Sequence, residues 1–208
     1  MNSKYLSLAV MAGLLAPSFA QASVTGVSNW GYSGGIYCYS PLWDSTGNIG
    51  IDAYQSGPGQ MGGTITTSDP LDPTLTIANS IDNDSSFAWT GYLVNVSMNT
   101  SFTILSAGVS APPGWTASIT QPGAPVAGIY TGVINYVGGT PVAIAPAPNS
   151  QLDFTYQVTF SGSTSYSLTE SVTPVPEPAT FSLLALGGLA LGGRVLARRW
   201  QAKPRPAA

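Results

Sequence analysis

Two aspartates that flank a single residue are the first group in this 208-residue chain whose types and spacing suggest chemistry. Asp82 and Asp84 stand on either side of Asn83, and carboxylate oxygens on alternate residues are ligands of the kind that Ca²⁺ prefers. The glycine and the bidentate glutamate of an EF-hand loop do not follow them. Asp82 and Asp84 are therefore calcium candidates, and the other interpretation is an Asx-type turn between strands. We predict no other metal and no cofactor.

Paired carboxylates could also catalyse the hydrolysis of a glycosidic bond. The chain has no histidine, however, and its basic residues are confined to Lys4 and to the segment from Arg194 onward. Eight acidic residues and no basic residue lie between positions 23 and 173, a formal charge of 0 − 8 = −8. Only backbone and amide groups would be left to stabilise a transition state. We predict that the protein is not an enzyme, and a secreted carbohydrate-acting enzyme is the catalytic alternative.

The same charge distribution limits the partners of the chain. A segment without Lys or Arg cannot neutralise phosphates, so we predict no nucleic-acid partner. The single Cys38 cannot form a disulfide within the chain. We expect its side chain to be a small buried apolar group.

Aromatic side chains are a third kind of candidate, because aromatic rings pack against the C–H faces of sugars. Trp43 and Trp115 are candidate glycan contacts, with packing in or beside the core as the alternative. The threonine-rich stretches 62–68 and 74–77 could form a flat ice-binding face, although threonine is also a common strand residue. A glycan- or ice-binding surface module is therefore an alternative function.

The segment that must position these residues, Ser23 to Thr173, has the pattern of an all-β domain. Gln151–Phe160 alternates between apolar and polar residues, which predicts a strand with one buried face. About ten short strands are predicted, separated by turn signals that include Gly57-Pro58-Gly59 and Gly138-Gly139. This spacing favours an antiparallel β-sandwich of Ig-like or jelly-roll type.

The beginning of the chain has the features of a secretory signal peptide. Lys4 precedes the apolar run Tyr5 to Ala16, and Ala20 and Ala22 form the small-x-small pattern of a cleavage site. We predict a signal peptide over residues 1–22, with Ser23 as the first residue of the mature chain. Because residue 23 is not cysteine, a lipid-modified N-terminus is not expected.

An apolar segment closes the other end of the chain. Residues 179–197 carry a single charge, Arg194, and as a helix they would span roughly 28 Å, close to the thickness of a bilayer core. Arg198 and Arg199 follow, and basic residues stay on the cytoplasmic side. We predict a transmembrane helix over 179–197 with Arg194, Arg198 and Arg199 at the membrane edge, and a basic cytoplasmic tail over 198–208.

Pro176-Glu177-Pro178 lies between the β-domain and this helix, in a linker over residues 174–178. Proline fixes the backbone and lacks an N–H, so we expect an extended segment that joins neither a helix nor a sheet ladder. Residues 175–180, the apolar helix and Arg198-Arg199 together resemble the PEP-CTERM sorting signal of Gram-negative bacteria. The resemblance covers about residues 175–199. It implies that an exosortase, a membrane cysteine protease, cuts near the motif, so that the helix is a transient anchor.

Proteins with this signal are associated with exopolysaccharide and biofilm, and the same signature occurs on some ice-binding proteins. The resemblance therefore implies an exported structural protein of the cell surface or extracellular matrix. Its expected processing partners are signal peptidase and an exosortase-like membrane protease. Exopolysaccharide is the candidate ligand of the body.

Overall fold

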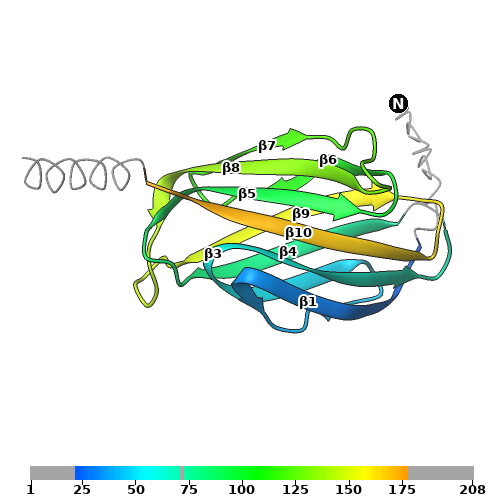
Figure 1. Cartoon of the computed structure of the whole chain (residues 1–208), viewed down its shortest axis with the longest axis horizontal. Helices are drawn as coiled ribbons and strands as arrows, with labels where there is room; N and C mark the ends of the chain where they lie inside the picture. The colour runs from blue at the N-terminus through cyan, green and yellow to red at the C-terminus, as the bar shows by residue number, and fades with distance from the viewer. Residues whose placement is uncertain (1–21, 71–72, 178–208) are drawn as a thin grey trace, which may run out of the picture.

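The computed structural model describes residues 22–70 and 73–177, and all regular secondary structure in these ranges is β-strand. The all-β prediction is confirmed. The ten described strands are β1 Val24–Cys38, β2 Leu42–Trp43, β3 Asn48–Thr67, β4 Thr74–Asn83, β5 Trp89–Met98, β6 Phe102–Ser110, β7 Thr116–Thr120, β8 Tyr130–Val142, β9 Gln151–Phe160 and β10 Ser165–Pro176 (Figure 1).

These strands form one hydrogen-bonded sheet in the order β6-β9-β4-β3-β10-β5-β8-β7, with β1 and β2 paired to β3 beside this path. Only the β3–β4 pair among them is parallel. The long strand β3 joins the two halves of the sheet, since Asn48–Gln55 pairs with β4 and Gly59–Thr66 pairs with β10. The described strands thus form a single sheet that curls back on itself, and a sandwich of Ig-like or jelly-roll type is not confirmed.

The segment Gly57-Pro58-Gly59 marks the point at which β3 changes partner. We expected a turn between two strands here, and that prediction is wrong, because β3 continues through it. The neighbouring strand β1 passes very close: a Cβ on Gly35 would lie 2.7 Å from the Gly57 nitrogen, and a Cβ on Gly34 would lie 2.8 Å from the Pro58 oxygen. Glycine on both strands therefore lets β1 follow β3 through the change of partner.

The edge strands β6 and β7 approach each other and nearly close the sheet (Figure 1). The Gln121 side chain, which follows β7, takes the place of a neighbouring strand. Its Oε1 accepts a hydrogen bond from the Ile104 backbone nitrogen at 2.9 Å, and its Nε2 donates to the Ile104 oxygen at 2.7 Å. The Gln121 side chain thereby links the end of β7 to the backbone of β6.

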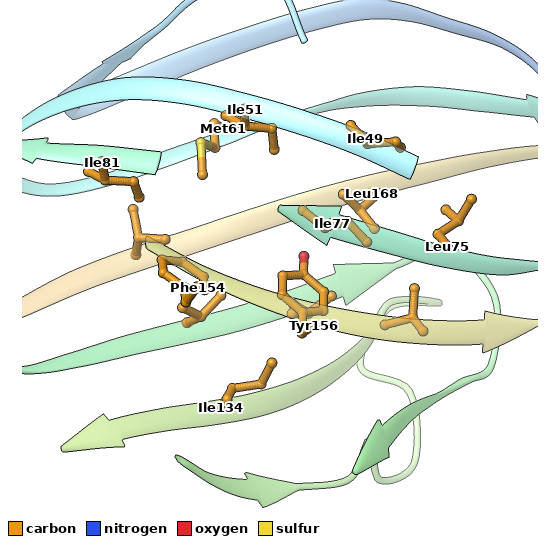
Figure 2. Packing of buried hydrophobic residues seen from close by; sticks show 14 of the residues in the cluster. Ile49, Ile51, Met61, Leu75, Ile77, Ile81, Ile134, Phe154, Tyr156 and Leu168 are labelled. Carbon is orange, nitrogen blue, oxygen red and sulfur yellow. The ribbon is translucent and has the colours of Figure 1, made fainter. Parts of the chain in front are cut away.

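The hydrophobic core fills the inside of the curled sheet, where side chains from β3, β4, β8, β9 and β10 meet (Figure 2). The predicted alternation of Gln151–Phe160 is confirmed, because its apolar residues are buried and its polar residues are not. Cys38 is also buried, as expected. The inward faces of β5 and β9 contribute the buried side chains Tyr92, Val94, Val96, Met98, Leu152, Phe154, Tyr156, Val158 and Phe160.

The predictions for the two ends fall mostly outside the described residues. Ala22 is buried and Ser23 is exposed at the start of the described part, whereas Ala20, the helix 179–197 and the tail 198–208 lie outside it. Within residues 22–70 and 73–177, no helix has the length and apolar character needed to cross a membrane.

Candidate functional site

The end of β10 carries the first residues of the proline–glutamate–proline motif. Val175 lies opposite Gly91 of β5, and after a register shift Pro176 lies opposite Trp89. We expected Pro176-Glu177-Pro178 to stay out of a sheet ladder, and for Pro176 this expectation is wrong. Pro174 and Val175 of the predicted linker also pair with β5. Pro178, the last residue of the motif, lies outside the described residues, as do Arg194, Arg198 and Arg199.

The position of β10 explains how proline fits into a ladder. The pairing of β10 with β3 ends at Val172, so beyond this residue β10 pairs only with β5. Proline is tolerated on such an edge, because its missing N–H removes no ladder hydrogen bond there. The Pro176 oxygen accepts a hydrogen bond from Thr90 Oγ1 at 3.3 Å, and the Glu177 nitrogen donates to the Ala88 oxygen at 3.3 Å. The first half of the motif is thus attached to the folded body.

Comparison with protein families gives a match to the end of the chain. A family model described as the PEP-CTERM protein-sorting motif matches residues 174–199. This chain carries a PEP-CTERM sorting motif. The resemblance inferred from the sequence is confirmed, and the motif supports an exported protein that an exosortase processes at the cell envelope. The search of curated proteins and the search of solved structures both find no match for the chain.

The PEP-CTERM motif therefore overlaps the β-domain. Its matched region begins at Pro174, which lies inside β10 and is buried. Gly91 allows the strand to lie close, since an added Cβ would be 3.1 Å from the Val175 Cβ. No spacer separates the last strand from the start of the PEP-CTERM motif, so the protease would meet a substrate that emerges directly from a folded sheet.

The residue between the two calcium candidates forms the turn. Asn83 Oδ1 accepts hydrogen bonds from the Ser85 nitrogen at 2.9 Å and from Ser85 Oγ at 2.6 Å. Its Nδ2 donates to the Phe87 oxygen at 2.9 Å. In the described part of the chain, no group of three or more His, Cys, Asp or Glu side chains is placed to hold a metal ion.

Asp82 and Asp84 instead belong to an acidic surface. Partial burial raises the pKa of Asp82 above its usual value, and the nearby carboxylates of Asp84, Asp153 and Asp52 raise it further. No Lys, Arg or His occurs anywhere between residues 22 and 177. The negative charge of this surface therefore has no basic side chain of the same segment to balance it.

The two tryptophan candidates have different environments. Trp43 of β2 is 42% exposed, and its role as a glycan contact stays a prediction. Trp115 is only 8% exposed, and its Nε1 donates to the Thr140 oxygen at 2.9 Å. Its ring packs on Gly138, where an added Cβ would lie 2.0 Å from Trp115 Cε2. The ring of Trp115 therefore has almost no surface to offer a ligand.

This packing also corrects the predicted turn at Gly138-Gly139. Strand β8 continues through both glycines to Val142. The absence of a side chain at Gly138 makes room for an indole ring and does not mark a chain reversal.

One buried carboxyl group, that of Glu170, was not predicted from the sequence. Glu170 of β10 is fully buried, its Oε2 accepts a hydrogen bond from Asn79 Nδ2 at 3.2 Å, and its Oε1 has no hydrogen-bond partner. Burial raises the pKa of Glu170 to about 7, although the hydrogen bond from Asn79 acts in the opposite direction. The signal was available, because Glu170 occupies an inward position in the alternating run of Tyr166, Leu168 and Val172.

A row of exposed tyrosines was also missed. It consists of Tyr32, Tyr37 and Tyr39, at and just after β1, together with Tyr54 of β3, and we call it the tyrosine row. Successive ring centroids lie 4.8, 5.6 and 5.9 Å apart, each in edge-to-face geometry. The i, i+2 spacing of Tyr37 and Tyr39 was a local hint, but the contribution of Tyr54 depends on the pairing of β1 with β3.

Proposed function

We propose that this protein is an exported structural component of the cell surface or extracellular matrix, sorted and cut by an exosortase-like membrane protease and associated with exopolysaccharide. The observation that carries the proposal is the PEP-CTERM match over residues 174–199, directly continuous with the last strand of a folded β-domain. The expected signal peptide over residues 1–22 would give entry to the export route. Signal peptidase is then the second processing enzyme.

The β-domain suits the part of a stable scaffold. The last residue of its hydrophobic core cluster is Val172, which precedes the PEP-CTERM match. Cleavage after Glu177 would therefore remove none of the core residues. Loss of residues 1–22 and of everything after the motif would also remove all six basic residues of the chain. The product would be a purely acidic β-body. We interpret its curled sheet as a variant of the β-sandwich in which β3 is shared by both halves.

A role without catalysis is part of the proposal. The body has no His, Lys or Arg, so a developing negative charge in a transition state would meet no cationic side chain. Glu170, a carboxyl group whose pKa burial raises, is fully buried and out of reach of a substrate. These features favour a structural or adhesive protein over a carbohydrate-acting enzyme.

Fractionation of cells that produce the wild-type precursor or Glu177→Ala tests the proposal. We expect wild-type protein in the surface and matrix fraction and Glu177→Ala in the membrane fraction. Ser163→Ala, in the exposed loop before β10, is the matched control and should behave as wild type. Equal amounts of wild type and Glu177→Ala in the matrix would contradict sorting by the motif.

The outer face of β10 favours one second candidate, an ice-binding module. Ser167 lies opposite Thr64 of β3, and Thr169 lies opposite Ser97 of β5. The outward positions of β10 all carry hydroxyl groups and no charge: Ser165, Ser167, Thr169, Ser171 and Thr173. A thermal-hysteresis assay decides this candidate, since a protein without hysteresis at high concentration is not an ice-binding module.

A further inference from the structure

We propose that the tyrosine row on β1 and β3 is the binding surface for an extended polysaccharide that carries no acidic groups. This inference rests on the matrix function proposed above and names the part of the body that would contact the polymer. It replaces Trp115, whose ring is buried, as the aromatic contact.

The exposure of the row is the first argument. Tyr32, Tyr37 and Tyr39 are 48, 47 and 50% exposed, and Tyr54 is 38% exposed. Single exposed aromatic side chains are normal, whereas a contiguous exposed group marks an interaction surface. Tyrosine is suited to such a surface, because it offers a large rigid ring and a polar hydroxyl at a small cost in conformational entropy. In this row Tyr39 also donates a hydrogen bond to Tyr54, between hydroxyl oxygens 3.5 Å apart.

The length of the row points to a polymer. A surface depression lies at each end of it, one lined by Tyr32 and Gln60 and the other by Tyr39 and Tyr54. Four rings at spacings of 4.8 to 5.9 Å connect the two depressions. A single sugar would cover one ring, whereas an extended chain of sugars can contact every ring in turn.

The chemistry beside the rings fits hydroxyl groups. The depression at Tyr39 and Tyr54 is also lined by Asp52, Asp82 and Gln151. Sugar rings present C–H faces that pack on aromatic rings and hydroxyl edges that donate hydrogen bonds, and carboxylates are strong acceptors. The row and this depression thus place aromatic surface beside a few polar groups, a combination that is typical of small-molecule sites.

The sign of the charge selects among polymers. The carboxylates of Asp52, Asp82, Asp84 and Asp153 interact on this side of the sheet, and the described body has no basic side chain. An acidic polysaccharide would be repelled. A second copy of the chain would bring the same negative charge to the contact, so self-association through the row is also disfavoured. A neutral polymer is compatible, and protonated amino groups on the sugars would strengthen binding.

Affinity electrophoresis of the full-length protein in detergent tests the inference. Gels contain hydroxyethyl cellulose as the neutral probe, soluble chitosan as the amine-bearing probe, or alginate as the acidic probe. We expect retardation by the first two and none by alginate. Tyr39→Ser and Tyr54→Ser should each weaken binding about three- to tenfold, as expected for the loss of one aromatic contact. Tyr54→Phe keeps the ring and should stay within about twofold of wild type.

Val126→Ser is the matched control, since Val126 is 80% exposed and lies outside the row. Unchanged thermal unfolding of each variant shows that it is folded. Retardation that survives both tyrosine substitutions, or equal retardation by alginate, overturns the inference. Binding to chitosan alone that disappears at physiological salt also overturns it, because such binding is only charge attraction. Failure here leaves the sorting experiment with Glu177→Ala untouched, and the reverse also holds.

Discussion

Asn79 donates a hydrogen bond to Glu170 at 3.2 Å from Nδ2 to Oε2, and both residues are buried between the two halves of the sheet. The second carboxyl oxygen of Glu170 and the Tyr156 hydroxyl have no hydrogen-bond partner. Burial raises the pKa of three tyrosine hydroxyls and one thiol around this group, and the charge of Glu170 raises it further. These groups belong to Tyr92, Tyr136, Tyr156 and Cys38. A single ionisable acid thus lies in the core without a cation.

This arrangement predicts a body that is more stable in mild acid. Burial raises the pKa of Glu170 from 4.5 to about 7 in the folded state. A raised pKa means that the folded protein favours the protonated form of Glu170. The contribution of Glu170 to the stability of the fold is therefore complete below pH 4.5 and is lost as the pH rises to 7. The difference corresponds to a loss of about 3 kcal/mol in the free energy of unfolding. Denaturant unfolding at pH 4.5 and at pH 8 measures it.

Glu170→Gln is the control for this pH dependence. Its amide oxygen can still accept from Asn79, and it has no charge to bury. We expect the variant to unfold with nearly the same free energy at both pH values and to exceed wild type at pH 8. A wild-type protein whose stability does not fall between pH 4.5 and 8 would contradict the role of Glu170.

Asp44 should give the thermal stability of the protein the opposite pH dependence, at lower pH. Its carboxylate accepts hydrogen bonds from Asn48 and Thr46, which hold the pKa of Asp44 well below its usual value. Because the pKa of Asp44 is lower in the folded protein than in the unfolded chain, its ionised carboxylate stabilises the fold at pH values above the unfolded-state pKa. This stabilisation is lost as the pH falls and the carboxylate becomes protonated. Asp44→Ala should therefore lower the Tm at pH 7 and show a smaller loss of Tm on acidification than wild type. Ser45→Ala, its exposed neighbour, should leave both unchanged.

The two candidate tryptophans, Trp43 and Trp115, should differ in how much they contribute to the free energy of unfolding. Trp115→Ala removes a buried ring that fills the space over Gly138, so we expect a loss of about 3–5 kcal/mol in the free energy of unfolding. Trp43→Ala, at an exposed position, should change it by less than about 1 kcal/mol. Chemical denaturation of both variants makes the comparison. Similar losses for the two would show that the burial of Trp115 does not determine its contribution.

Gln121 should control the closure between β6 and β7. In Gln121→Ala the Ile104 backbone loses both of its partners, and we expect a loss of about 1–3 kcal/mol. Hydrogen exchange of the Ile104 amide measures the effect directly. Gln121→Glu keeps an acceptor for this amide and should give an intermediate rate. Unchanged exchange in Gln121→Ala would mean that the edge is held by other contacts.

Some of this structure could be predicted from the sequence because its cause is local. The alternation in Gln151–Phe160 reflects one buried face, and the observed β9 has the same limits. The PEP-CTERM motif is also local, since its proline–glutamate–proline triplet, apolar run and arginines are contiguous. Features of this kind need no knowledge of the neighbouring strands.

Other features depend on partners that are distant in the chain. Gly57-Pro58-Gly59 and Gly138-Gly139 have the composition of turns, yet each lies inside a strand because of what packs against it, β1 in one case and Trp115 in the other. The attachment of Pro176 to β5 and the assembly of the tyrosine row likewise depend on strand pairing. Sequence patterns within one segment do not contain this information.

The intact mass of the exported protein is the most direct test of the central claim, that the PEP-CTERM motif directs processing of a folded β-body. We predict a chain that begins near Ser23 and ends close to Pro176-Glu177-Pro178, without the apolar segment and the arginine-rich tail. The same measurement on Glu177→Ala should give a product that retains both. Wild-type protein recovered from the surface or matrix with its C-terminal residues up to Ala208 intact would contradict the account.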